Sequence, residues 1–156
     1  MLKTKKLAAN IAVPLLVGGV SAFISRSGMQ NFEKLAKPPL SPPAALFPAV
    51  WTILFVLMGI ASYLVAVSDA DEKQTDNALT VYALQLGVNF LWSIFFFKFG
   101  WYLFSFFWLI LLWAMILYTI ILFSRISKKA AYLLIPYIVW VSFAGYLNLG
   151  VALLNR

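Results

Sequence analysis

The sequence contains no cysteine and no histidine, and its charged residues are few: 12 Lys and Arg and 5 Asp and Glu among 156 residues. The missing residues exclude a disulfide framework, a thiol nucleophile, an imidazole base, a zinc site of the usual kind and a His-ligated haem. Soluble domains carry about a quarter charged residues. With 11% charged residues and a mean hydropathy of +0.92, the chain is predicted to be a small integral membrane protein.

Five apolar segments carry none of the charges, and each is long enough to cross a membrane. A spanning helix needs about 20 apolar residues, whereas barrel strands would alternate over about ten. The sequence therefore predicts an all-α integral membrane protein, a bundle of five transmembrane helices in a single domain (1–156). The helices are expected at 7–25, 46–67, 78–97, 101–124 and 131–154.

The first segment has a second interpretation. Three lysines precede an apolar run that contains Val20-Ser21-Ala22, and this arrangement resembles a secretory signal peptide with its cleavage site. The run continues to Ile24 and carries small residues that suit close helix packing, which favours a membrane span.

The longest connector, 26–43, ends in a proline-rich stretch, Pro38-Pro39-Leu40-Ser41-Pro42-Pro43. Each proline restricts its own backbone and that of the residue before it. We expect a stiff, extended strap over one end of the bundle.

The net charge of +7 predicts contact with anionic lipid headgroups rather than nucleic acid, because no basic cluster is interleaved with aromatic residues. Seven of the basic residues fall on the amino-terminal side of the predicted bundle and five on the other. By the positive-inside rule, a multi-pass protein of a bacterial cell membrane with a cytoplasmic amino terminus is expected.

Neutral polar side chains repeat at helical spacing inside the third and fifth segments. A carboxamide that faces lipid would leave hydrogen-bonding groups unpaired, so both stripes are expected to face the bundle interior. The stripes are Gln85, Asn89 and Ser93, and Trp140, Ala144 and Asn148.

Two interpretations of these stripes remain open. The amides could simply join helices by hydrogen bonds. However, Trp51, Trp92 and Trp140 lie inside their segments, whereas a headgroup belt would place tryptophan at the ends. Aromatic faces with a few amides are typical of a pocket for a flat apolar ligand.

The third segment also contains a pair of small residues, Ala83 and Gly87, four positions apart. Such a pair permits close approach of two helices. It predicts either the interface of a homodimer or packing within one bundle.

Four linked motifs follow one another along the chain. They are Leu35-Ala36-Lys37-Pro38…Pro42-Pro43, Pro48-x-x-Trp51, Gln85-x-x-x-Asn89-x-x-Trp92…Phe96-Phe97, and Pro136-Tyr137-x-x-Trp140…Ala144-x-x-Leu147-Asn148. Together they resemble the TspO/MBR family of tryptophan-rich sensory proteins and translocator proteins, and the resemblance covers about residues 10–155.

The resemblance implies a five-helix bundle, usually dimeric, with a cavity beneath the first connector. Family members bind porphyrins such as protoporphyrin IX and haem, cholesterol, and synthetic isoquinoline or benzodiazepine ligands. No covalent cofactor and no metal site are expected. The ligand-binding positions would be Ala22, Trp51, Asn89, Trp92, Trp140, Phe143, Ala144 and Leu147.

The leading expectation is thus a membrane receptor or sensor that binds porphyrin. Asn89 would bond a pyrrole or propionate, and Lys34 or Lys37 would pair with a propionate at a lid that includes Pro38, Pro42 and Pro43. One alternative, implied by some bacterial relatives, is light-dependent porphyrin degradation in which Trp51 and Trp140 act. Another is a transporter of tetrapyrroles or sterols.

Overall fold

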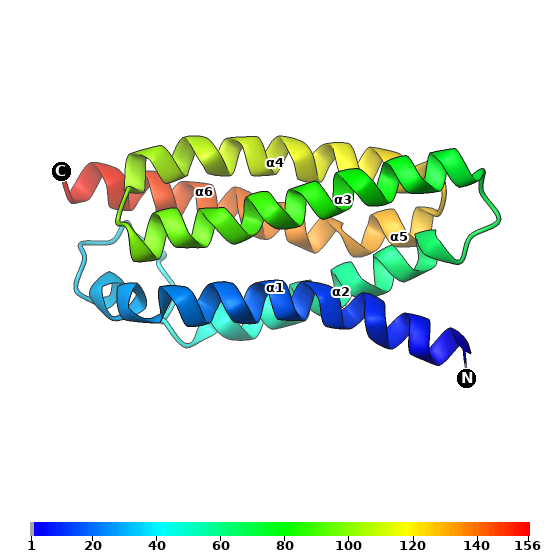
Figure 1. Cartoon of the computed structure of the whole chain (residues 1–156). Helices are drawn as coiled ribbons and strands as arrows, with labels where there is room; N and C mark the ends of the chain where they lie inside the picture. The colour runs from blue at the N-terminus through cyan, green and yellow to red at the C-terminus, as the bar shows by residue number, and fades with distance from the viewer. Residues whose placement is uncertain (1) are drawn as a thin grey trace.

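Five long helical segments run back and forth along a common axis in the computed structural model, which describes residues 2–156 (Figure 1). No strand occurs in that range, and five helices are long and apolar enough to span a membrane. The predicted fold class is confirmed. The elements are α1 (Leu2–Glu33), α2 (Leu46–Ala66), α3 (Glu72–Ser93), a π-helical turn η1 (Ile94–Lys98), α4 (Tyr102–Ser124), α5 (Lys128–Leu133) and α6 (Ile135–Leu154).

Helix α1 is longer than the predicted span 7–25, and the strap is shorter than the predicted 26–43. The polar turns after Ser25 stay helical because they contain no proline and bury one face, which includes Gly28 and Phe32. A Cβ at Gly28 would overlap the carbonyl of Phe97, so only glycine lets α1 approach η1 this closely. The connector between α1 and α2 therefore covers residues 34–45.

The third span begins earlier than the predicted residue 78. Asp71 accepts a hydrogen bond from the backbone N–H of Gln74 (3.3 Å) and caps a polar first turn, as expected for an N-cap aspartate. The span ends in η1, after which the backbone turns sharply at Gly100, where φ is 67°. Hydropathy marks only the apolar part of this helix.

The fifth span also begins before its predicted start, and it is broken. Ser127 caps α5 by accepting from the backbone N–H of Ala130 (3.3 Å). The break between α5 and α6 precedes Pro136, which has no N–H to donate. The second and fourth spans, in contrast, start and end within one residue of the prediction.

The strap lies at the end of the bundle that also holds the carboxyl terminus and the η1–α4 turn, opposite the amino terminus (Figure 1). Its first half is attached to the last turns of α6. The Asn155 side chain accepts from the Ala36 N–H (3.1 Å) and donates to the Ala36 carbonyl (2.8 Å). Pro38 is buried against Gly150, where a Cβ would overlap the proline ring.

Candidate functional site

A cavity of about 440 Å³ lies between α1, α2, α3 with η1, and α6, beside the end of the strap. Its volume falls within the range of about 300–1,000 Å³ that small-molecule sites occupy. Nine of the 23 residues that line it are aromatic. The rings belong to Phe32, Phe47, Trp51, Phe55, Phe90, Trp92, Phe96, Phe97 and Trp140.

The structure brings seven of the eight predicted ligand-binding residues to this cavity: Ala22, Trp51, Asn89, Trp92, Trp140, Ala144 and Leu147. Phe143 is the exception and does not line it. That residue lies at the edge of the α6 stripe, and its ring packs against Trp140 (5.6 Å between centroids) and Tyr146 (6.2 Å). Phe143 therefore supports a wall residue and does not itself form the wall.

Two stacked aromatic pairs form adjoining parts of the wall. Trp51 stacks on Phe55 with ring centroids 5.5 Å apart, and Trp92 stacks on Phe96 at 5.4 Å. The two indoles lie 6.4 Å apart at an interplanar angle of 35°. The rings of each pair lie close to parallel, at interplanar angles of 29° and 22°, so each pair presents a nearly flat aromatic face.

The carboxamide of Asn89 joins the cavity wall to a buried chain of hydrogen bonds. Its Nδ2 donates to Tyr137 Oη (2.6 Å), and that hydroxyl donates to Gln85 Oε1 (2.7 Å). Because one end of the Asn89 amide is used in this way, its Oδ1 is available to a ligand. Asn89 therefore fits both interpretations of the polar stripe, since it joins helices and also lines the cavity.

Trp140 differs from Trp92 in its hydrogen bonding. The Trp92 indole N–H donates to Asn148 Oδ1 (3.0 Å). The buried Nε1 of Trp140 has no hydrogen-bond partner among residues 2–156. Trp140 lines the cavity, but its N–H is enclosed by the protein and is not exposed to that space.

The predicted lid residues do not line the cavity. Lys37 turns back to the end of α1, where its Nζ donates to the carbonyls of Glu33 (3.0 Å) and Leu35 (3.3 Å) and sits 5.0 Å from the Phe32 ring centroid. A cation is favourable at a helix carboxyl end. Glu33, by contrast, does line the cavity, so the charged side chain in the wall is an acid and not the expected lysine.

The rest of the lid lies outside the cavity wall as well. Lys34 and Pro43 are exposed, Pro42 is half-buried, and Pro38 is packed on α6. The part of the connector that borders the cavity comes just after the prolines, at Ala44, Ala45, Phe47 and Pro48.

This aromatic cavity in a five-helix membrane bundle agrees with a match over nearly the whole sequence. A family model described as the TspO/MBR family matches residues 10–154. The chain belongs to the TspO/MBR family.

Relatives of this TspO/MBR protein come from distant organisms. The chain is 39% identical over 150 residues to the "Tryptophan-rich protein TspO" of Chlorobaculum tepidum, covering 96% of this chain and 95% of that one. It is 34% identical to the "Translocator protein" of Bos taurus (87% and 82% covered). It is 32% identical to the "Tryptophan-rich sensory protein" of Cereibacter sphaeroides (80% and 76% covered). The resemblance inferred from the four motifs is confirmed.

Several wall residues of this TspO/MBR protein were not among the predicted ligand-binding positions, although Phe96 and Phe97 stand in the third motif. Phe55 and Phe96 follow Trp51 and Trp92 by four positions, a spacing that places both members of each pair on one helix face. The α1 wall has no comparable signal in the sequence. It consists of Val17, Gly18, Ser21, Ala22, Met29, Phe32 and Glu33, so the cavity depends on α1 being present.

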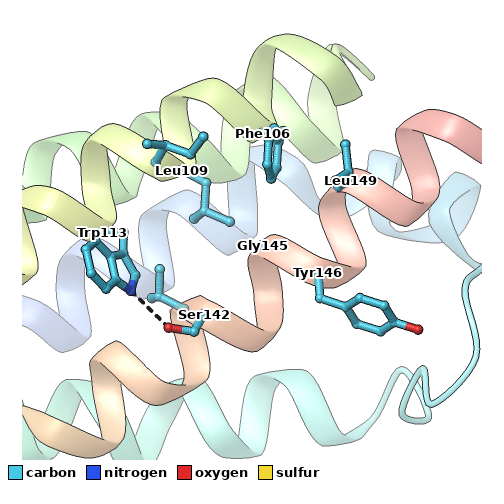
Figure 2. Close-up of a pocket in the computed structure, with 9 residues that line it drawn as sticks. Phe106, Leu109, Trp113, Ser142, Gly145, Tyr146 and Leu149 are labelled. Carbon is cyan, nitrogen blue, oxygen red and sulfur yellow. Dashed lines mark hydrogen bonds between the residues drawn. The ribbon is translucent and has the colours of Figure 1, made fainter.

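A second hollow, of about 290 Å³, lies between α4 and α6 (Figure 2). Its walls are almost entirely apolar, and Trp113 Nε1 donates to Ser142 Oγ (2.9 Å) at one side. No residue predicted to bind a ligand lies here. Because Trp113 is an indole outside the main cavity, it provides a control for mutations of the cavity tryptophans.

The small pair on α3 of this TspO/MBR protein faces outward. Ala83 and Gly87 are both exposed, and no atom of residues 2–156 lies within 4 Å of a Cβ built at Gly87. Packing of this pair inside one bundle, one of the two predicted explanations, is therefore wrong.

Proposed function

We propose that this protein is a membrane receptor or sensor that binds porphyrins such as protoporphyrin IX and haem, and related flat apolar ligands, in the aromatic cavity. The observation that carries the proposal is the pair of flat walls formed by Trp51 on Phe55 and Trp92 on Phe96. Aromatic faces bind a planar ring system by offset or edge contacts over a large apolar area. The names of the relatives, which include a sensory protein and a translocator protein, agree with a role in ligand binding.

Polar groups in the cavity suit a ring with a few hydrogen-bonding atoms. Asn89 lines the cavity, and its Oδ1 would accept from a ligand because its Nδ2 donates to Tyr137. Because the sequence has neither His nor Cys, haem would be held by its ring rather than by an imidazole or thiolate on the iron. The propionates of a porphyrin would lie at the mouth, where Glu33 lines the cavity.

Porphyrin titration of cavity variants tests the proposal. Trp51→Ala removes one member of a stacked pair, and Trp140→Ala removes a separate indole of the wall. We expect each to raise the Kd for protoporphyrin IX, measured by fluorescence quenching, about tenfold or more. Trp113→Ala is the matched control, because this indole lies at the outer hollow. If all three variants bind porphyrin as the parent protein does, the cavity is not the binding site.

Analysis of the porphyrin for breakdown products, after incubation with the protein in light and in darkness, separates binding from light-dependent degradation.

We also propose that the protein is a homodimer that pairs through the α3 face around Ala83 and Gly87. Small exposed residues at this spacing let two helices approach closely in a membrane. Gly87→Leu should shift the protein from dimer to monomer in cross-linking and light scattering. Gly19→Leu is the control, since Gly19 is exposed on α1 with open space around it. An unchanged dimer in Gly87→Leu would contradict this interface.

A further inference from the structure

Gly18 on α1 is the one glycine among the 23 residues that line the aromatic cavity. It lies against Phe55 of α2, which lines the same cavity. A Cβ built at Gly18 would lie 2.7 Å from Phe55 Cδ2 and 2.8 Å from Cζ, and closer still to Cε2, which real Cβ atoms essentially never do. The Phe55 ring therefore occupies the space that a side chain at position 18 would fill.

The contact at Gly18 differs in kind from the other close approaches of α1. At Gly28 and Gly59 a Cβ would overlap backbone atoms of the neighbouring helix, so a side chain there would push whole helices apart. At Gly18 every overlapped atom belongs to one aromatic ring, and a ring can turn about its side-chain torsions. A side chain at position 18 would thus displace the Phe55 ring and leave the helices in place.

The surroundings of Phe55 decide where a displaced ring would go. The side chain is only 7% exposed, and its ring stacks on Trp51 with centroids 5.5 Å apart and an interplanar angle of 29°. Protein interiors are close-packed, and the unfilled space beside both rings is the cavity that they line. The ring would turn into that cavity, which would break the stack and narrow the space for a ligand.

We propose that Gly18 is a positioning residue of the ligand site. The missing side chain lets the Phe55 ring lie along α1 and nearly parallel to Trp51, so that the pair presents a flat face to a planar ligand. Glycine inside a helix is less favourable than alanine, and this contact gives a reason for glycine here. The proposal rests on the proposed function, in which the Trp51–Phe55 pair is one of the two faces that bind a porphyrin.

Gly18→Ala tests the proposal in a porphyrin titration. An aromatic face contact changes affinity by about three- to tenfold, and we expect the Kd for protoporphyrin IX to rise by this factor. Gly19→Ala is the matched control, because it adds the same methyl group to the next residue of the helix, where no atom of residues 2–156 lies within 4 Å of the Cβ. Its Kd should not change. Equal Kd values in Gly18→Ala and in a parent protein that binds porphyrin would overturn the proposal.

Phe55→Val shows whether the effect passes through the Phe55 ring. Valine lacks the ring atoms that the new Cβ would meet, so adding Gly18→Ala to Phe55→Val should raise the Kd less than about twofold. The same three- to tenfold loss in both backgrounds would mean that Phe55 is not involved, and the proposal would be wrong. If Gly18→Ala alone does not fold, Phe55→Val should restore folding; a double variant that stays unfolded while Phe55→Val folds would also contradict the proposal.

Nuclear magnetic resonance of the ligand-free protein in detergent separates this proposal from that of porphyrin binding. The six tryptophans give six indole N–H signals, and Trp51→Phe assigns the one that belongs to Trp51. Gly18→Ala should shift this signal, because the ring current of the stacked Phe55 moves with the ring, and Gly19→Ala should not. An unshifted signal would overturn the positioning role even in a protein that binds porphyrin. A shifted signal in a protein that does not bind protoporphyrin IX would support the positioning of Phe55 and count against the porphyrin proposal alone.

Discussion

Trp92 and Asn148 are joined across two helices by a hydrogen bond of 3.0 Å from the indole N–H to the amide oxygen. The same amide donates from Nδ2 to the Tyr102 carbonyl (2.7 Å) at the start of α4. One carboxamide of α6 therefore connects α3 and α4 at the level of the cavity. It keeps the Trp92 ring in place as part of the wall.

Asn148→Leu is expected to destabilise the protein, because it leaves the Trp92 N–H and the Tyr102 carbonyl without their partner. The loss should be about 1–3 kcal/mol of unfolding free energy, measured by denaturation in mixed micelles. Ser142→Ala is the control, since it removes an exposed hydrogen bond to Trp113 that should contribute about 0.6 kcal/mol. Equal losses in the two variants would show that the buried amide has no special role.

Glu33→Gln is expected to strengthen binding of protoporphyrin IX if the porphyrin occupies the cavity. Glu33 lines the cavity, and its negative charge opposes the propionates of the ligand. Two charges 4 Å apart in water interact by about 1 kcal/mol, so the Kd should fall about fivefold. The dimethyl ester of the same porphyrin carries no carboxylate and should bind both proteins equally. A fivefold change with the ester as well would rule out charge as the cause.

Gly150→Ala should loosen the strap from α6. Its Cβ would overlap the Pro38 ring, and overpacking of this kind costs about 1–3 kcal/mol. Gly19→Ala adds the same methyl group to a helix where no atom of residues 2–156 lies within 4 Å, and helix propensity should make it neutral or up to about 1 kcal/mol stabilising. Thermal melting of both variants provides the measurement. A stable Gly150→Ala protein would mean that the strap moves without cost.

The orientation predicted from the basic residues can be measured with single cysteines, because the parent chain has none. Asp69→Cys places a thiol in the α2–α3 connector on the amino-terminal side, and Lys34→Cys places one on the strap side; both positions are exposed. In intact bacterial cells, a membrane-impermeant maleimide should label only Lys34→Cys. Labelling of Asp69→Cys alone would reverse the predicted orientation.

The spans that the sequence predicted well are those in which the apolar run and the helix coincide. Helices α2 and α4 contain no charged residue and end at turns, so hydropathy located them within one residue. The other three spans continue into polar turns that hydropathy does not recognise as helical. The capping of α3 by Asp71 and the burial of Phe32 in α1 depend on hydrogen bonds and packing rather than on transfer to lipid.

The cavity was predicted only in part for a related reason. Spacing on one helix placed Asn89 with Trp92, and Trp140 with Ala144, on interior faces. Spacing did not single out the side chains of α1 that would face them, because its buried polar residues are only two small serines, Ser21 and Ser25. It also could not show that Lys37 would bind the end of α1 instead of the cavity mouth.

The amino-acid sequence by itself determined the membrane environment and the five spanning helices, because the cost of placing charge in hydrocarbon is a property of each residue. The absence of Cys and His also determined which catalytic and metal-binding groups are missing. The sequence also contained the motifs of the family. Only the tertiary structure decided which aromatic rings share one cavity, that Ala83 and Gly87 face outward, and that Tyr137 joins Asn89 to Gln85. Those facts depend on how helices distant in the sequence rotate and pack against one another.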